Sequence, residues 1–287
     1  MSGDERFGFV QLEFPWALGP PDGRYVLRRH AGEPAEHVLV LATLGAAERR
    51  RLGRRRSRPA PPEPAPTTVM VGRATVVDAG ALADEQAAEA WMRAAADPDG
   101  DVVAAAVGVL NLAVHAHRLA AADPHVHEVS PAQALVVRVG HGLGEQVADG
   151  LWDHAVELEP RRPGQRERVG ALDPQGRLAA LLGARDAPLA CEELALRSRL
   201  DLDRGREREA ALQLQAALAA AQAELSAWAG VPGMAERLGE LGRNSDELAP
   251  VAAAALQGAL PAGGREVVVS AQERLESALR ARVARTG

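Results

Sequence analysis

The sequence predicts an α+β protein, with a mostly antiparallel β-sheet and two helices in its N-terminal part and an all-helical bundle after them. Segments that are apolar, or alternate between apolar and polar residues, lie before residue 160. Two stretches within 81–122, and most of the chain from 171 onward, carry apolar residues at the 3/4 spacing of helices. Strands grouped before helices are typical of α+β proteins or of two domains, and not of a repeating βαβ unit.

The predicted strands are short and are bounded by turn residues. The first, 7–14, places Val10 and Leu12 on one face and Gln11 and Glu13 on the opposite face. The strand 37–44 is almost wholly apolar, which indicates an internal position in the sheet. The other strands are expected at residues 24–29, 67–78, 132–140 and 152–158.

Two helices are expected within 81–122. The sequence DPDG at 97–100 separates them, and we expect Asp101 to cap the second helix by accepting a bond from a free amide. From residue 171 the pattern is helical, and Asp173 followed by Pro174 is typical of a helix start. Further helices are expected at 204–229, 234–241, 246–260 and 266–284. The apolar stripe of 204–229 consists of Ala211, Leu214, Leu218, Ala221, Leu225 and Trp228.

A domain boundary is expected near residue 165, which gives a β-containing domain, 1–165, and a helical domain, 166–287. Within the first domain, residues 46–66 are rich in Arg and then in Pro, so we expect an exposed loop or linker there. Guanidinium groups bind phosphates and carboxylates, and these Arg residues are therefore candidates for partner binding. They are Arg49, Arg50, Arg51, Arg54, Arg55, Arg56 and Arg58.

The basic segment is the main electrostatic feature of an acidic chain. Residues 45–73 contain eight Arg and two Glu, so this segment carries +6 and the remaining residues carry −12 of a net charge of −6. No aromatic residues are interleaved with these Arg, as they are in single-strand nucleic-acid platforms. Any contact with nucleic acid is therefore expected to be weak, salt-sensitive and independent of base sequence.

The composition suggests the origin and the compartment of the chain. All 33 basic residues are Arg, and Lys and Ile are absent, which indicates a high-GC bacterial genome. The single cysteine, Cys191, cannot form an internal disulfide. Uncharged runs such as 102–114 are shorter than the roughly 18 residues of a membrane span. Because the N-terminus also lacks the pattern of a signal peptide, we expect a cytoplasmic protein without membrane contact.

Histidines are concentrated between residues 115 and 154. His115 and His117 fall in a predicted helix, where side chains two residues apart point about 200° apart and cannot chelate one ion. The candidates for a metal site are His125, His127, His141 and His154. No C-x-x-C or H-E-x-x-H motif accompanies them, so we expect neither a metal nor a cofactor.

Two further patterns resemble functional sites. The glycines at 140, 142 and 144 follow a predicted strand but lack the G-x-G-x-x-G spacing, so they predict a hairpin connection and not a phosphate-binding loop. Cys191 lies in a helical segment with no histidine near it in the sequence. We therefore interpret it as a small buried hydrophobic residue and not as a nucleophile.

These features favour a non-catalytic adaptor or scaffold that binds another protein or a second copy of itself. One alternative is an enzyme or metal-binding protein that uses the region from His115 to His154. A second alternative is an accessory protein that contacts nucleic acid through Arg49–Arg58. The sequence does not decide whether the chain is an enzyme.

Overall fold

The computed structural model describes residues 5–45, 70–97, 100–159 and 174–283. The chain divides into two compact units, residues 1–163 and 164–287. Each unit has its own hydrophobic core. The candidate residues Arg49–Arg58, with the rest of the segment 46–66, lie outside the described residues.

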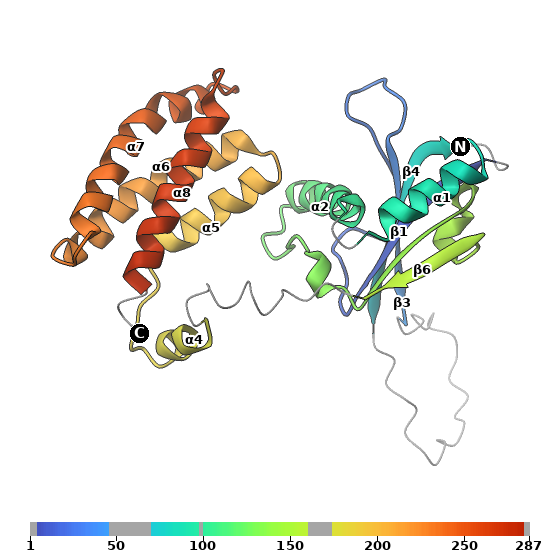
Figure 1. Cartoon of the computed structure of the whole chain (residues 1–287), viewed down its shortest axis with the longest axis horizontal. Helices are drawn as coiled ribbons and strands as arrows, with labels where there is room; N and C mark the ends of the chain where they lie inside the picture. Colours follow the sequence, from blue (N-terminus) through green and yellow to red (C-terminus); the bar gives the residue numbers. More distant parts are fainter. Residues whose placement is uncertain (1–4, 46–69, 98–99, 160–173, 284–287) are drawn as a thin grey trace, which may run out of the picture. The chain divides into compact units, whose positions relative to one another are not determined.

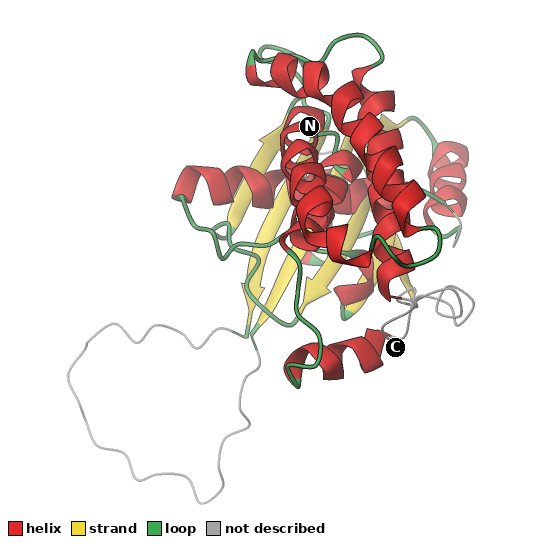
Figure 2. Ribbon diagram, turned by 90° about the vertical axis from the view of Figure 1, so that its left-hand side faces the viewer, coloured by secondary structure: helices red, strands yellow, loops and turns green. Residues whose placement is uncertain are grey.

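A six-stranded antiparallel sheet forms the centre of the N-terminal unit, as the sequence predicts; its strands lie side by side in Figure 2. The strand order is β2-β3-β4-β1-β5-β6, so the first strand of the chain lies in the interior of the sheet (Figure 1). The strands are β1 (Arg6–Phe14), β2 (Gly23–Leu27), β3 (His37–Leu44), β4 (Val71–Leu82), β5 (Val136–Leu143) and β6 (His154–Leu158).

One face of the sheet carries the main core of this unit. Val10, Leu12 and Phe14 of β1 are buried on this face, in one apolar cluster with residues of helices α1 (Glu85–Ala95) and α2 (Val102–Ala121). Alternation along β1 places these three side chains on the same side, as the sequence pattern predicted for Val10 and Leu12.

The opposite face is also buried, although neither α1 nor α2 covers it. Phe7 and Phe9 pack there in a cluster with Val147 of the short helix η2 (Gly144–Asp149) and with Trp152. The rings of Phe9 and Trp152 are stacked, with their centroids 5.5 Å apart. The connection between β5 and β6 therefore supplies the apolar cover for this side of the sheet.

Gln11, which the pattern placed on this second face, is fully buried and hydrogen-bonded. Its Nε2 donates to Oγ1 of Thr75 at 3.0 Å, and its Oε1 accepts from Nη1 of Arg138 at 2.5 Å. Both partners lie directly opposite Gln11 in the sheet register. A buried amide needs such partners, because an unsatisfied one costs about 1–3 kcal/mol.

The two helices of this unit begin differently. Asp84 has an extended backbone, and its Oδ1 accepts a bond from the Ala87 amide at 2.8 Å. Asp101 precedes α2 but has helical backbone angles and makes no capping bond with its side chain. The predicted capping role of Asp101 is therefore wrong, since a capping side chain requires a non-helical residue at that position.

The C-terminal unit is a helical bundle, again as predicted. Leu214, Leu218 and Leu225 of the predicted stripe are fully buried, and Trp228 packs against the same cluster. Figure 1 shows the last four helices of this unit side by side. The helices are α4 (Pro174–Leu182), α5 (Ala190–Asp203), α6 (Glu207–Glu224), α7 (Met234–Leu256) and α8 (Gly264–Val283).

Helix α7 differs from the prediction of two separate helices at 234–241 and 246–260. It runs without a break from Met234 to Leu256 and includes Pro250. Leu241, Leu248 and Ala255 are spaced by seven residues and are fully buried in the core of the bundle. This continuous buried face keeps the segment helical in spite of its weak helix formers.

Candidate functional site

Of the four histidine candidates, the structure brings only His141 and His154 together. They lie opposite each other on the neighbouring strands β5 and β6, and their ring centroids are 6.1 Å apart. His125 and His127 lie in the loop after α2 and line a different cavity, of about 350 Å³. Within the described parts of the chain, no group of three or more His, Cys, Asp or Glu residues is arranged to hold a metal ion.

The remaining histidines of this region, His115 and His117, lie on α2, as the sequence predicted. His115 faces Glu128, with its Nδ1 3.8 Å from the carboxylate Oε1. The i and i+2 positions of a helix do not share a face, so these two imidazoles do not form a chelating pair.

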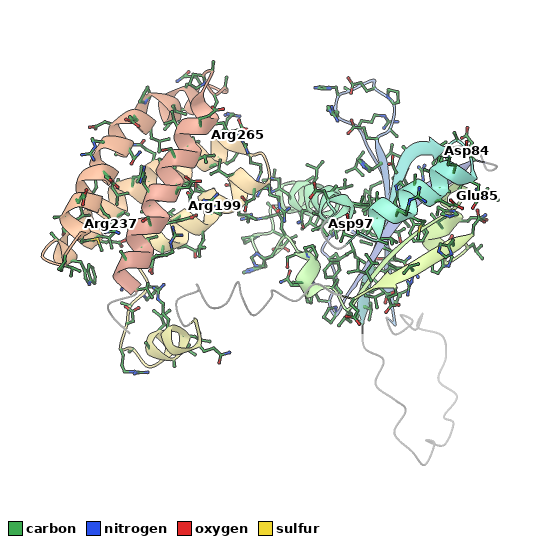
Figure 3. The ribbon with its side chains drawn as sticks, in the orientation of Figure 1. Asp84, Glu85, Asp97, Arg199, Arg237 and Arg265 are labelled. Atoms are coloured by element: carbon green, nitrogen blue, oxygen red, sulfur yellow. The ribbon has the colours of Figure 1, made fainter. Side chains whose placement is uncertain are left out.

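A cavity of about 390 Å³ adjoins the pair formed by His141 and His154, and we call it the α1 cavity. Helix α1 forms one wall through four residues that share a face of the helix, and its start, with Asp84 and Glu85, is labelled in Figure 3. The sheet forms the other wall through the first residues of β1 and β6 and through β5. The lining residues are Arg6, Glu85, Glu89, Met92, Arg93, His141, Asp153 and His154.

Arg6 is held in the α1 cavity by two carboxylates. Its Nε donates to Asp153 at 2.8 Å, and its Nη1 donates to Glu85 at 2.7 Å. The hydrogen bond to Asp153 is the main cause that raises the pKa of Arg6. Two bonds from different walls hold the guanidinium group in one orientation, so its charge is fixed beside the two histidines.

His141 is the buried polar residue of this cavity, with 4% of its surface exposed. Its Nδ1 is shielded from solvent and has no hydrogen-bond partner in the structure. Burial lowers the pKa of His141, and the positive charge of Arg6 lowers it further. Both effects favour the neutral imidazole, which has one nitrogen able to donate a hydrogen bond and another able to accept one or bind a metal.

The glycine-rich segment packs inside the sheet and does not form a phosphate loop. β5 extends through Gly140 and Gly142 to Leu143, three residues beyond the predicted end of this strand. A Cβ on Gly140 would lie 2.5 Å from the carbonyl oxygen of His154, and one on Gly142 would lie 2.8 Å from Val147 Cγ1. Close approach of η2 and β6 explains these glycines. The connection between the antiparallel strands β5 and β6 begins only at Gly144, so the prediction that Gly140 and Gly142 belong to a hairpin connection is wrong.

Cys191 has the properties that the sequence predicted for it. It is fully buried in the core of the bundle. Burial, together with Glu224, raises the pKa of its thiol to about 12. The thiolate is the reactive form of cysteine, so the burial and the raised pKa both disfavour reaction at this residue.

Helix α2 presents a second feature that the candidate residues did not include. Its inner face is buried on the sheet, whereas Leu112 and Leu119 are 59% and 68% exposed on its outer side. By length and composition alone α2 could cross a membrane, a property that it shares with core helices of soluble proteins. The signal was present in the sequence, because α2 carries large apolar residues on more than one side.

Comparison with known protein families, curated proteins and solved structures finds no match to this chain.

Proposed function

We propose that this chain is a non-catalytic scaffold that assembles with a second copy of itself through the outer face of α2. This outer face consists of Ala105, Gly108, Leu112, Ala116 and Leu119. Leu112 and Leu119 supply the single observation that carries the proposal, because large apolar side chains exposed on one helix face favour burial against a partner. A Cβ added at Gly108 would meet no atom within 4 Å, so the face is open at this position.

The spacing of this face favours a second copy over an unrelated partner. The positions are symmetric about Leu112: in an antiparallel pair of α2 helices, Ala105 faces Leu119, Gly108 faces Ala116, and Leu112 faces its own counterpart. A twofold interface requires such self-complementarity. Within α2 the charged side chain is that of Arg118, which lies off this face by helical geometry.

The size of the face predicts weak association. A helix of 20 residues is about 30 Å long and about 10 Å wide, so each copy would bury roughly 300 Å². Stable interfaces bury about 800 Å² per partner. We therefore expect a reversible dimer that forms at high protein concentration.

Sedimentation of the full chain over a range of concentrations tests this proposal. We expect a dimer that dissociates on dilution and that Leu112→Glu abolishes, because the charge would be buried at the twofold axis. The matched control is Leu196→Glu on α5, since Leu196, at 68%, is at least as exposed as Leu112, at 59%. A chain that is monomeric at every concentration contradicts the proposal, and binding of the monomer to lipid vesicles through Leu112 would assign this face to a membrane instead.

Cysteine cross-linking tests the antiparallel arrangement separately. Facing Cα atoms of packed helices are about 4–6 Å apart, which suits a disulfide. Leu112→Cys should therefore link to itself, whereas Ala105→Cys should link only to Leu119→Cys in a mixed sample. A parallel pair would link each variant to itself. Cys191 is buried, with a pKa of about 12, and does not compete.

A further inference from the structure

The cross-strand pair of His141 and His154 is close enough for both imidazoles to bind one ion. The two residues are register partners on β5 and β6, so their side chains project from the same face of the sheet. Their ring centroids are 6.1 Å apart. Metal–nitrogen bonds are about 2.0–2.1 Å long. Two imidazoles bound to the same ion therefore have ring centroids roughly 5 Å apart when the bond angle at the metal is tetrahedral. The centroids are about 6.4 Å apart when the two ligands lie on opposite sides of the metal.

We propose that the α1 cavity binds a divalent transition-metal ion through His141 and His154. This site is independent of the proposed self-association, because its residues lie outside the outer face of α2. Imidazole suits zinc, nickel, copper and iron, in contrast to the oxygen ligands of magnesium and calcium.

The burial of His141 supports the proposal independently of the distance. Its Nδ1 is shielded from water and has no partner in the structure. A buried polar atom is normally satisfied by a protein group, an ordered water molecule or a bound ion. A ligand that occupies the cavity would engage this ring, which lines it.

The charged residues of the α1 cavity limit its affinity for a metal ion. Asp153 and Glu85 face the site but are bound to Arg6, whose positive charge opposes a cation. In the described part of the chain no third His, Cys, Asp or Glu completes the set. The ion would therefore keep water or an external molecule at its other coordination positions. Structural metal sites, in contrast, have all their coordination positions filled by protein ligands.

Titration of the metal-free full chain with Zn²⁺ and with Co²⁺ tests the site, by calorimetry and by the visible absorption of bound cobalt. We expect one saturable ion per chain. His154→Gln should weaken binding at least roughly tenfold, since even loss of an indirect partner of a metal ligand costs that much. His154 is exposed, so this variant is expected to fold; His125→Gln, in the other cavity, is the matched control.

The substitution Arg6→Gln provides a second test, in which we expect zinc to bind more tightly and not more weakly. Removal of the guanidinium group eliminates the repulsion and releases the Asp153 carboxylate, so zinc should bind more tightly to this variant than to the parent. Binding that is absent from the parent, or that His154→Gln leaves unchanged, overturns the proposal. Weaker binding to a folded Arg6→Gln variant also overturns it, because the charge argument would then have the wrong sign.

Discussion

At the scale of single residues, two glycines determine how closely neighbouring groups pack on the sheet. Gly8 of β1 lies under Trp91 of α1, and a Cβ there would be 2.3 Å from the indole ring. Gly140 lies on the opposite face, under Phe9 and close to the backbone of β6. Both glycines allow neighbouring groups to approach the backbone more closely than any other residue would permit.

Replacement of Gly140 by Ala should destabilise the N-terminal unit by about 1–3 kcal/mol, as overpacking of a filled core does. The new Cβ would lie 2.5 Å from a backbone oxygen, which cannot move as easily as a side chain. Chemical denaturation measures the change. Gly80→Ala is the control, because its nearest contact is 3.4 Å. Equal stability of the Gly140→Ala protein would show that β5 and β6 are farther apart than described.

At the scale of elements, periodicity identified the helices, and packing decided where they end. Gly205, with φ of +68°, ends the turn after α5, so the predicted helix 204–229 begins at Glu207. The same kind of sequence signal, at Gly242, does not interrupt α7. The difference is that the left-handed conformation of Gly205 is required by the turn, whereas buried leucines hold α7 helical on both sides of Gly242.

Replacement of Leu218 by Asp should unfold or strongly destabilise the bundle, by about 3 kcal/mol or more, because it buries an unpaired charge. Leu218 is fully buried, between α6 and its neighbours. Thermal unfolding followed by circular dichroism measures this. Leu196→Asp changes the same residue type at an exposed helical position and should have little effect. A stable Leu218→Asp protein would mean that the stripe does not form the core.

The labelled Arg199 shows how surface charges join helices of the bundle (Figure 3). Its Nε donates to Glu276 of α8 at 2.8 Å. Burial acts to raise the pKa of Glu276, but hydrogen bonds from Arg199 and Gln272 outweigh it and hold the pKa below its usual value. The pair thus stabilises the contact between α5 and α8 above the pH at which a free glutamate titrates.

At the scale of the whole molecule, the two units have separate cores, and we expect each to fold without the other. Residues 164–287, expressed alone, should give a helical spectrum and a single cooperative unfolding transition, since the described residues of their apolar core all lie within this unit. Calorimetry of the full chain should then show the transition of the isolated fragment unchanged. A fragment that is unfolded, or that melts well below its transition in the full chain, would contradict this expectation.

The sequence by itself determined the class of the protein and most of its elements. Strand β3 has the same bounds as predicted, 37–44, and the stripe of α6 is buried as expected. These are local properties, because alternation and 3/4 spacing are read from residues that are neighbours in the chain. The burial of Cys191 also followed from a local pattern.

Only the tertiary structure decided which functional groups meet. Arg6 bonds to residues 79 and 147 positions away, and it does so because β1 inserts between β4 and β5. The same strand order separates His141 and His154 from His125 and His127, which the sequence had grouped together. Strand order depends on which distant segments pair. The apolar pattern predicted that 37–44 is internal in the sheet, but it does not specify which strands are neighbours.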